Sequence, residues 1–254
     1  MRFASLGSGS RGNATLIQAG KTMVLVDCGF SVAETQRRLD RLGTAPEAIA
    51  AILVTHEHSD HSTGVARLAR RHGLPVWATP GTARFWERNG GPPDLHLFSC
   101  HDAFTIGDLC VQPFPVPHDA REPSQFVFED GAHRLALLTD TGSGTPHIEA
   151  RIGGVDALLL ECNHDPEMLA RSRYSAALKQ RVGGRFGHLS NDQAASLLER
   201  IDCSRLQHLT AMHLSQENNT PELARAALAA ALGCGPDWIT VADQERGLSW
   251  QTVA

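Results

Sequence analysis

The sequence predicts an α/β fold in which β-sheets are covered by helices. Short apolar segments typical of buried strands alternate along the chain with segments of helical periodicity. Gly and Pro separate these segments, and the chain closes on two further strand-like segments. The sequence has no internal repeat, low-complexity stretch or long linker, so we expect residues 1–254 to form a single domain.

The expected strands are short runs rich in Val, Ile, Leu and Phe: Met23–Val26, Ile52–Val54, Pro75–Ala78, Leu109–Phe114, Gln125–Phe128, Leu135–Leu138 and Ala157–Leu160. The expected helices are Ser31–Leu42, Gly64–Arg71, Thr82–Asn89, Ser172–Val182, Asn191–Ile201 and Pro221–Ala231. Ser190 and Thr220 precede the last two helices, and Pro221 suits a first helical position. A strand pair, Trp238–Ala242 and Gly247–Val253, is expected to end the chain.

Composition limits the class of protein. The chain has 23 Lys and Arg against 28 Asp and Glu, a net charge of −5, which excludes a polycation but permits a local basic face. Its 6 Cys are scattered without a CxxC pair, so we expect buried, reduced thiols. Because we find neither a secretory signal nor a long apolar run, we expect a cytoplasmic protein without a membrane partner. The 13 histidines are an excess that needs an explanation.

Part of this histidine excess lies in one turn, Thr55-His56-Glu57-His58-Ser59-Asp60-His61, directly after an apolar strand. Such a turn projects several imidazoles and a carboxylate into one space. Imidazole nitrogen and carboxylate oxygen are ligands of Zn²⁺ and also suit Mn²⁺ or Fe²⁺. Ligands this close together surround two ions more easily than one.

The HxHxDH turn resembles the motif of the metallo-β-lactamase superfamily, and further family residues follow in the same order. Asp27 is similar to the aspartate that braces the metal loop, and His118, Asp140 and His213 are similar to the later ligands. The resemblance spans Phe3 to Asn219. It implies an αββα sandwich, with two packed mixed β-sheets flanked by helices and a dinuclear site at one edge.

The resemblance also implies how two divalent ions are held. One ion is expected on His56, His58 and His118, and the other on Asp60, His61 and His213, with Asp140 bridging both. Zn²⁺ is the expected metal and Mn²⁺ the alternative, because the ligand set contains no thiolate.

Glu161 and the segment Gly187-His188-Leu189-Ser190 resemble the phosphodiesterase and nuclease branch of the family. This implies catalytic roles for His188, which protonates the departing oxygen, for Glu161, which orients His188, and for Asp60, which orients the nucleophile. The segment from Met168 to Asn191 has no acidic residue and carries five cations: Arg171, Arg173, Lys179, Arg181 and Arg185. These cations favour contacts between this segment and the phosphates of a substrate. The alternative interpretation is that they form a solvated helix face without a binding role.

A glycine-rich loop near the N-terminus adds Ser10 and Asn13 as candidate substrate or supporting contacts, and His164 is a further candidate for contact with substrate. Arg173, Lys179 and Arg181 complete the expected substrate-binding set. These motifs together resemble a compact bacterial branch of stand-alone exonuclease-like proteins, although Cys162 stands where that branch usually has Ser. The intervals between the motifs are too short for an inserted domain or a tRNA-gripping arm.

We therefore expect a dinuclear-metal hydrolase of phosphodiester bonds, most specifically a DNA exonuclease with the 5′-to-3′ polarity that the resemblance implies. Its expected partner is nucleic acid, at DNA ends, or a small phosphodiester. The alternatives are a small-molecule cyclic phosphodiesterase, a glyoxalase-II-like thioesterase and a non-catalytic metal-binding regulator.

Overall fold

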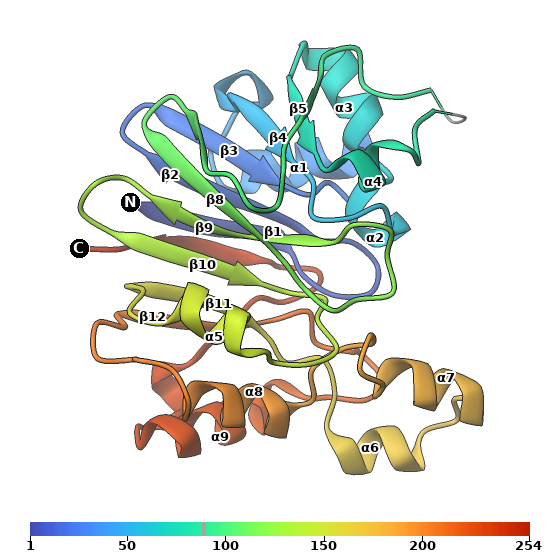
Figure 1. The fold of residues 1–254 in the computed structure, drawn as a ribbon, viewed down its shortest axis with the longest axis vertical. Coiled ribbons are helices and arrows are strands. Elements are labelled where there is room, and N and C mark those ends of the chain that lie inside the picture. The colour runs from blue at the N-terminus through green and yellow to red at the C-terminus, as the bar shows by residue number, and fades with distance from the viewer. Residues whose placement is uncertain (88–89) are drawn as a thin grey trace.

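The computed structural model describes residues 1–87 and 90–254. Two β-sheets pack face to face, and helices cover the outer face of each sheet (Figure 1). The expected αββα sandwich is therefore confirmed.

The first sheet has the order β14-β1-β2-β3-β4-β5-β6 in the described chain. β3, β4, β5 and β6 are parallel, while β14, β1, β2 and β3 pair antiparallel. The strands are β1 (Arg2–Gly7), β2 (Ala14–Ala19), β3 (Thr22–Val26), β4 (Ala51–Leu53), β5 (Val76–Ala78), β6 (Leu95–Leu97) and β14 (Leu248–Thr252).

The second sheet has the order β13-β12-β11-β10-β9-β8-β7 in the same residues. β10, β11, β12 and β13 are parallel, while β7, β8, β9 and β10 pair antiparallel. The strands are β7 (Phe104–Ile106), β8 (Leu109–Pro115), β9 (Ser124–Glu129), β10 (Arg134–Leu138), β11 (Ala157–Glu161), β12 (His208–Met212) and β13 (Thr240–Val241).

Helices of the first half of the chain lie beside the first sheet: α1 (Val32–Arg41), α2 (Ser59–Ser62), α3 (Val65–His72) and α4 (Pro80–Ala83). The second sheet is covered by α5 (Pro146–Ile152), α8 (Asn191–Leu198) and α9 (Pro221–Leu232). α6 (Pro166–Arg171) and α7 (Ala176–Val182) project from one end of the sandwich (Figure 1). No helix in the described residues is both long and apolar enough to span a bilayer.

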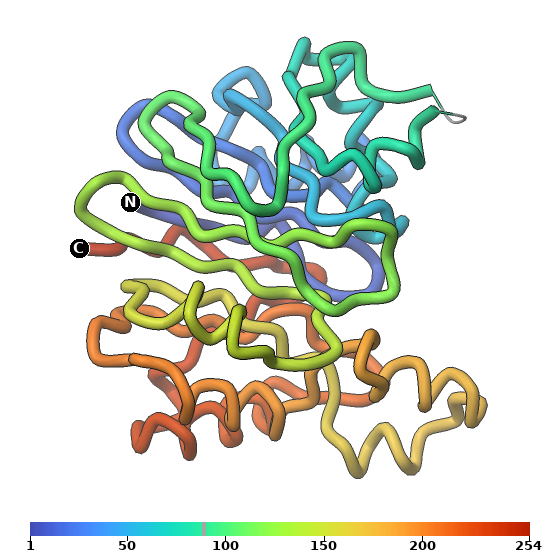
Figure 2. The backbone as a smooth tube through the Cα atoms, in the orientation of Figure 1, coloured from blue at the N-terminus to red at the C-terminus, as the bar shows by residue number. Residues whose placement is uncertain are grey.

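The strands could be predicted because many are buried on both faces. Val24 and Val26 pack between the two sheets, whereas Met23 and Leu25 of the same strand pack against the helix layer that includes Leu39. Burial on both faces removes the polar alternation and leaves a continuous apolar run. The two chain ends meet at one edge, where β1 pairs with β14, and Figure 2 shows them close together.

Three predicted elements need correction. The expected helix Thr82–Asn89 begins earlier, because Thr79 caps the chain at Pro80, and it ends at Ala83; its last residues, 88–89, lie outside the described residues. The expected helix Ser172–Val182 starts only at Ala176, because the extended Ser172 ends α6 and Ser175 caps α7. The two expected closing strands are present as β13 and β14, but they do not form a pair, because they belong to different sheets.

Candidate active site

The site lies where parallel strands end. Because parallel strands run in the same direction, their carboxyl ends meet at one edge of each sheet, and the residues that follow converge there. The strands β3, β4, β10, β11 and β12 lead respectively to Asp27, the His56–His61 turn, Asp140, Glu161 and His213.

Three of these residues adopt the left-handed backbone conformation. Asp27, Asp140 and His213 have φ values of 60°, 50° and 54°, and no other non-glycine residue in the described chain has a positive φ. This conformation costs roughly 1–3 kcal/mol for a residue with a Cβ and persists where the surrounding structure enforces it. The strain is therefore concentrated at the strand ends that carry the site.

His56, His58 and His118 form the first cluster, with ligand atoms within 4.8 Å of one another. His118 Nδ1 lies 3.0 Å from the Gly187 carbonyl oxygen and donates to it, so Nε2 of the neutral ring carries a lone pair. That atom lies 3.2 Å from His58 Nδ1. His56 Nε2 is buried and has no hydrogen-bond partner. Burial lowers the pKa of both His56 and His118, which keeps these rings neutral and able to bind a cation.

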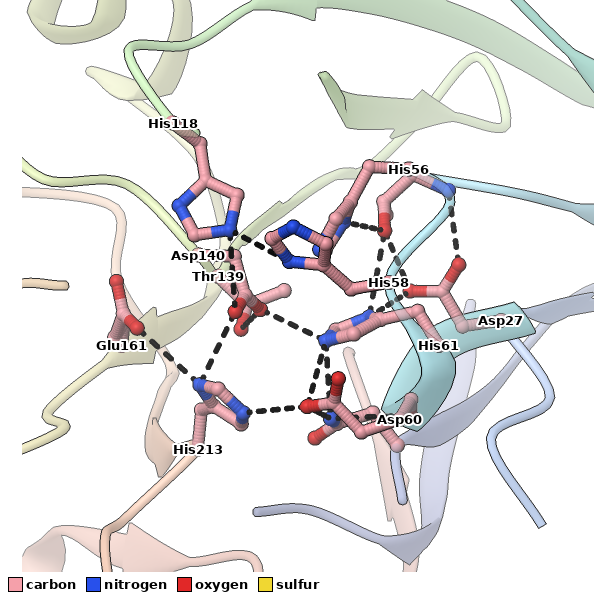
Figure 3. A network of polar contacts seen from close by, with 12 residues as sticks. Asp27, His56, His58, Asp60, His61, His118, Thr139, Asp140, Glu161 and His213 are labelled. Atoms are coloured by element: carbon pink, nitrogen blue, oxygen red, sulfur yellow. Dashed lines mark hydrogen bonds and ion pairs between the residues drawn. The ribbon is translucent and has the colours of Figure 1, made fainter. Parts of the chain in front are cut away.

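Asp60, His61 and His213 form the second cluster, and Asp140 lies between the two clusters (Figure 3). His61 Nε2 lies 3.1 Å from Asp140 Oδ2 and 3.5 Å from Asp60 Oδ2, while His213 Nε2 lies 3.4 Å from Asp60 Oδ2. Burial opposes protonation of His61, but Asp140, Asp60 and Asp27 raise its pKa well above the usual value. The same carboxylates would also be neutralised by a bound cation.

Asp27 braces the His56–His61 turn without joining either cluster. Its Oδ1 accepts from the Thr55 amide at 2.8 Å, and its Oδ2 accepts from the Thr55 hydroxyl and from His61 Nδ1, each at 2.7 Å. Because His61 Nδ1 donates to Asp27, the lone pair of the neutral ring is on Nε2, which faces the second cluster.

The two clusters fit divalent cations. His56 Nε2 has no hydrogen-bond partner, and His58 Nδ1 and His118 Nε2 face each other. Two carboxylates converge on His61, and a cation would neutralise their charge. The buried Cys28 and Cys162 belong to the apolar core rather than to either cluster. A nitrogen and oxygen donor set of this kind suits Zn²⁺ or Mn²⁺.

The buried Glu161 and the partly exposed His188 form a dyad next to the clusters. His188 Nδ1 donates to Glu161 Oε1 at 2.7 Å, and Glu161 Oε2 accepts from the amides of Thr141 at 2.9 Å and Leu189 at 3.2 Å. Burial disfavours the charged form of His188, but Glu161 and then Asp140 raise its pKa. Glu161 is fully buried, yet His188 keeps the pKa of its carboxyl below the usual value. The dyad therefore holds the His188 ring in a fixed orientation and favours its protonated form.

A cleft of about 360 Å³ opens over the clusters and the dyad. Of the residues expected from the sequence, it is lined by Ser10, His58, Asp60, Asp140, Arg181, His188 and His213. Sequence reasoning did not single out Tyr174 and Asp119, which also line it. Tyr174 is the only tyrosine of the chain, four residues before Leu178, and this spacing was an available signal.

Four expected substrate contacts lie elsewhere in the structure. Asn13 is buried beneath the second cluster, with its Nδ2 3.1 Å from His61 Nε2 and 3.3 Å from Asp60 Oδ2. The His164 ring is buried, and burial lowers its pKa. Lys179 Nζ donates to the Ala170 carbonyl at 2.6 Å, which ties α7 to α6. Arg173 is exposed, and it does not line the cleft.

Comparison with known proteins agrees with this geometry. A family model described as "Beta-lactamase superfamily domain" matches residues 22–213. The chain is 37% identical to an exodeoxyribonuclease YycJ of Bacillus anthracis, over 91% of this chain and 89% of the relative. It is 36% identical to an exodeoxyribonuclease WalJ of Streptococcus pneumoniae, over 93% of this chain and 92% of the relative.

Solved structures share the fold at low sequence identity. Zn²⁺-bound PqqB from Methylobacterium extorquens has a TM-score of 0.75 and 21% identity, covering 99% of this chain and 100% of its own. The metallo-β-lactamase fold protein YhfI from Bacillus subtilis has a TM-score of 0.76 and 15% identity, covering 99% of both chains. These likenesses concern the fold alone.

The chain belongs to the metallo-β-lactamase superfamily. It is a metal-dependent hydrolase that binds divalent metal, and the histidine and aspartate clusters are its candidate ligands. Within the superfamily it falls in the stand-alone nuclease-like branch, as the relatives that align over nine-tenths of its length indicate.

Proposed function

We propose that this protein is an exodeoxyribonuclease that hydrolyses the terminal phosphodiester bond of a DNA strand, with 5′-to-3′ polarity. The observation that carries the proposal is the Glu161–His188 dyad, which shares a cleft with both metal-binding clusters. A phosphodiester needs a proton donor for its departing alkoxide, and this dyad supplies one. The relatives named exodeoxyribonuclease support DNA as the substrate.

The proposal includes two divalent ions, with Zn²⁺ as the first candidate and Mn²⁺ as the second. His56, His58 and His118 would hold one ion, Asp60, His61 and His213 would hold the other, and Asp140 would contact both. When bound, such ions supply the Lewis-acid charge that neutralises phosphate oxygens and activates water at neutral pH.

The remaining steps belong to side chains of the cleft. The Asp60 carboxylate accepts a hydrogen bond from the attacking water and orients it. His188 donates the proton on Nε2 to the departing oxygen, while Glu161 holds the opposite nitrogen, Nδ1. Glu161 raises the pKa of His188, which favours the protonated form that a general acid requires.

Ser10 and Arg181 bind the substrate phosphate in this scheme. Both line the cleft, and Arg181 is held there by Asp119, whose Oδ2 accepts from Arg181 Nε at 2.6 Å. A guanidinium presents paired donors to phosphate oxygens, so Arg181 both attracts and aligns the strand. The cleft volume falls in the range of a small-ligand site, which suits one terminal nucleotide at a time.

The test is a substrate panel with the metal-supplemented protein. The substrates are end-labelled single- and double-stranded DNA, bis-p-nitrophenyl phosphate and a thioester. We expect stepwise release of nucleotides from the 5′ end, at a rate that falls as salt increases. Hydrolysis of the thioester or of bis-p-nitrophenyl phosphate without digestion of DNA would overturn the proposal. Release of nucleotides from the 3′ end alone would overturn the proposed polarity.

A further inference from the structure

α7 contributes nothing to the apolar core. It is the only α-helix in the described chain without a buried residue. Figure 1 shows it projecting with α6 beyond the end of the sandwich. Its carboxyl end is fixed next to the site, because the His188 amide donates to the Val182 carbonyl at 2.8 Å. The side chains of α7 are therefore not explained by packing.

Three apolar side chains of this segment face the active-site cleft. Tyr174, Leu178 and Val182 follow one another at four-residue intervals, and all three line the cleft together with the metal-binding residues. We call them the apolar stripe. Leu178 remains 36% exposed, and Tyr174 is half-buried. Neither metal binding nor phosphate binding requires apolar surface, so the stripe fits another part of the ligand.

Arg181 lies on the same helix and lines the same cleft. Its link to Asp119 fixes it beside the first cluster, since Asp119 Oδ1 lies 3.8 Å from His58 Nε2. The cleft therefore combines a fixed cation and metal-binding groups with an aromatic and aliphatic surface. A nucleotide has the complementary arrangement, an anionic phosphate beside a flat apolar base.

We propose that the apolar stripe is a base-binding subsite, in which the ring of Tyr174 stacks on the base of the nucleotide being released. This inference rests on the proposed function and names the part of the substrate that α7 recognises. Stacking on an aromatic ring tolerates every base, because each base has a π face. It also requires the terminal base to leave its partner in a duplex, so ends that are unpaired are digested faster than paired ends.

The experiment compares oligonucleotides with a normal and an abasic terminal nucleotide. For wild type, removal of the terminal base should raise KM about tenfold to a hundredfold, the range that base stacking on an aromatic ring supplies. Tyr174→Ala should cause a similar rise on the normal strand and little further change on the abasic strand. Tyr174→Phe should behave as wild type, because it keeps the ring.

Phe186→Ala is the matched control. Phe186 is an exposed aromatic side chain of the same segment, and it does not line the cleft. We expect it to leave KM unchanged on both strands. Phe186→Ala should also hydrolyse bis-p-nitrophenyl phosphate at the wild-type rate.

Two failures can be told apart. If wild type digests DNA but Tyr174→Ala raises KM equally on normal and abasic strands, or not at all, the base-binding subsite is refuted while the exonuclease stands. If wild type digests no DNA, both the proposed function and this inference are refuted.

Discussion

Replacing Glu161 by Gln tests whether Glu161 raises the pKa of His188. The substitution preserves the size of the side chain and removes its charge. In the wild-type protein the pKa of His188 is raised by Glu161, its strongest favourable partner, against the opposing effect of burial. Without the carboxylate, burial remains and the pKa of His188 must fall.

The size of this change follows from one contact. The His188 Nδ1 to Glu161 Oε1 distance is 2.7 Å, and the Glu161 side chain is fully buried. A hydrogen bond to a charged group contributes about 1.5–3 kcal/mol. One pKa unit corresponds to 1.36 kcal/mol, so the pKa of His188 should fall by about 1–2 units.

The assay is the pH profile of kcat on single-stranded DNA, with metal content measured in parallel. A general acid must be protonated, so activity is lost as the pH rises through the pKa of His188. In Glu161→Gln this loss should occur about 1–2 pH units lower. The kcat should therefore be reduced about 10- to 100-fold at pH values above the wild-type pKa of His188 and little at pH values below the lowered pKa.

Glu149→Gln is the control for this experiment. Glu149 lies on α5, where its carboxylate accepts a hydrogen bond from Arg200 Nε at 2.7 Å, and it does not line the cleft. Its removal should leave the profile unchanged. A Glu161→Gln profile that coincides with wild type would refute the role of Glu161, and a loss of bound metal would show that Glu161 acts through the metal site instead.

Three further substitutions separate the roles of the site. His58→Ala should abolish DNA digestion while circular dichroism and the melting temperature stay close to wild type, because the side chain is 28% exposed and adds little to the core; full activity would remove it from the ligand set. His188→Ala should lower kcat about 10²- to 10⁴-fold with metal content unchanged, measured by single-turnover kinetics beside elemental analysis. Arg181→Ala should raise KM for DNA and should reduce the slope of log KM against log salt concentration by about one. Arg200→Ala, also exposed but outside the cleft, should change neither quantity.

The sequence was most informative where both faces of a strand are buried. Leu158 and Leu160 face the helix layer while Leu159 faces the other sheet, and the resulting continuous apolar run is recognisable. Short helices were harder to predict. α6 begins with the capped pair Asp165-Pro166, the same signal as Thr220-Pro221 in α9, but it is too short to show a helical period.

Parts of the site also differ in how well the sequence predicts them. Its clusters could be predicted because His56, His58, Asp60 and His61 occupy one turn, where spacing in the sequence fixes proximity in space. Contacts made by side chains on separate segments could not be predicted. His164, a predicted substrate contact, is buried, whereas Tyr174, just before α7, lines the cleft because of where that helix lies.

The central claim is that the two clusters hold the metal ions on which DNA cleavage depends. The most direct measurement is a titration of the chelated protein with Zn²⁺ or Mn²⁺, following bound metal and nucleotide release from 5′-labelled DNA in the same samples. We predict that release is absent without metal and rises with binding until two equivalents are bound. Undiminished digestion by protein shown to be free of metal would contradict the account.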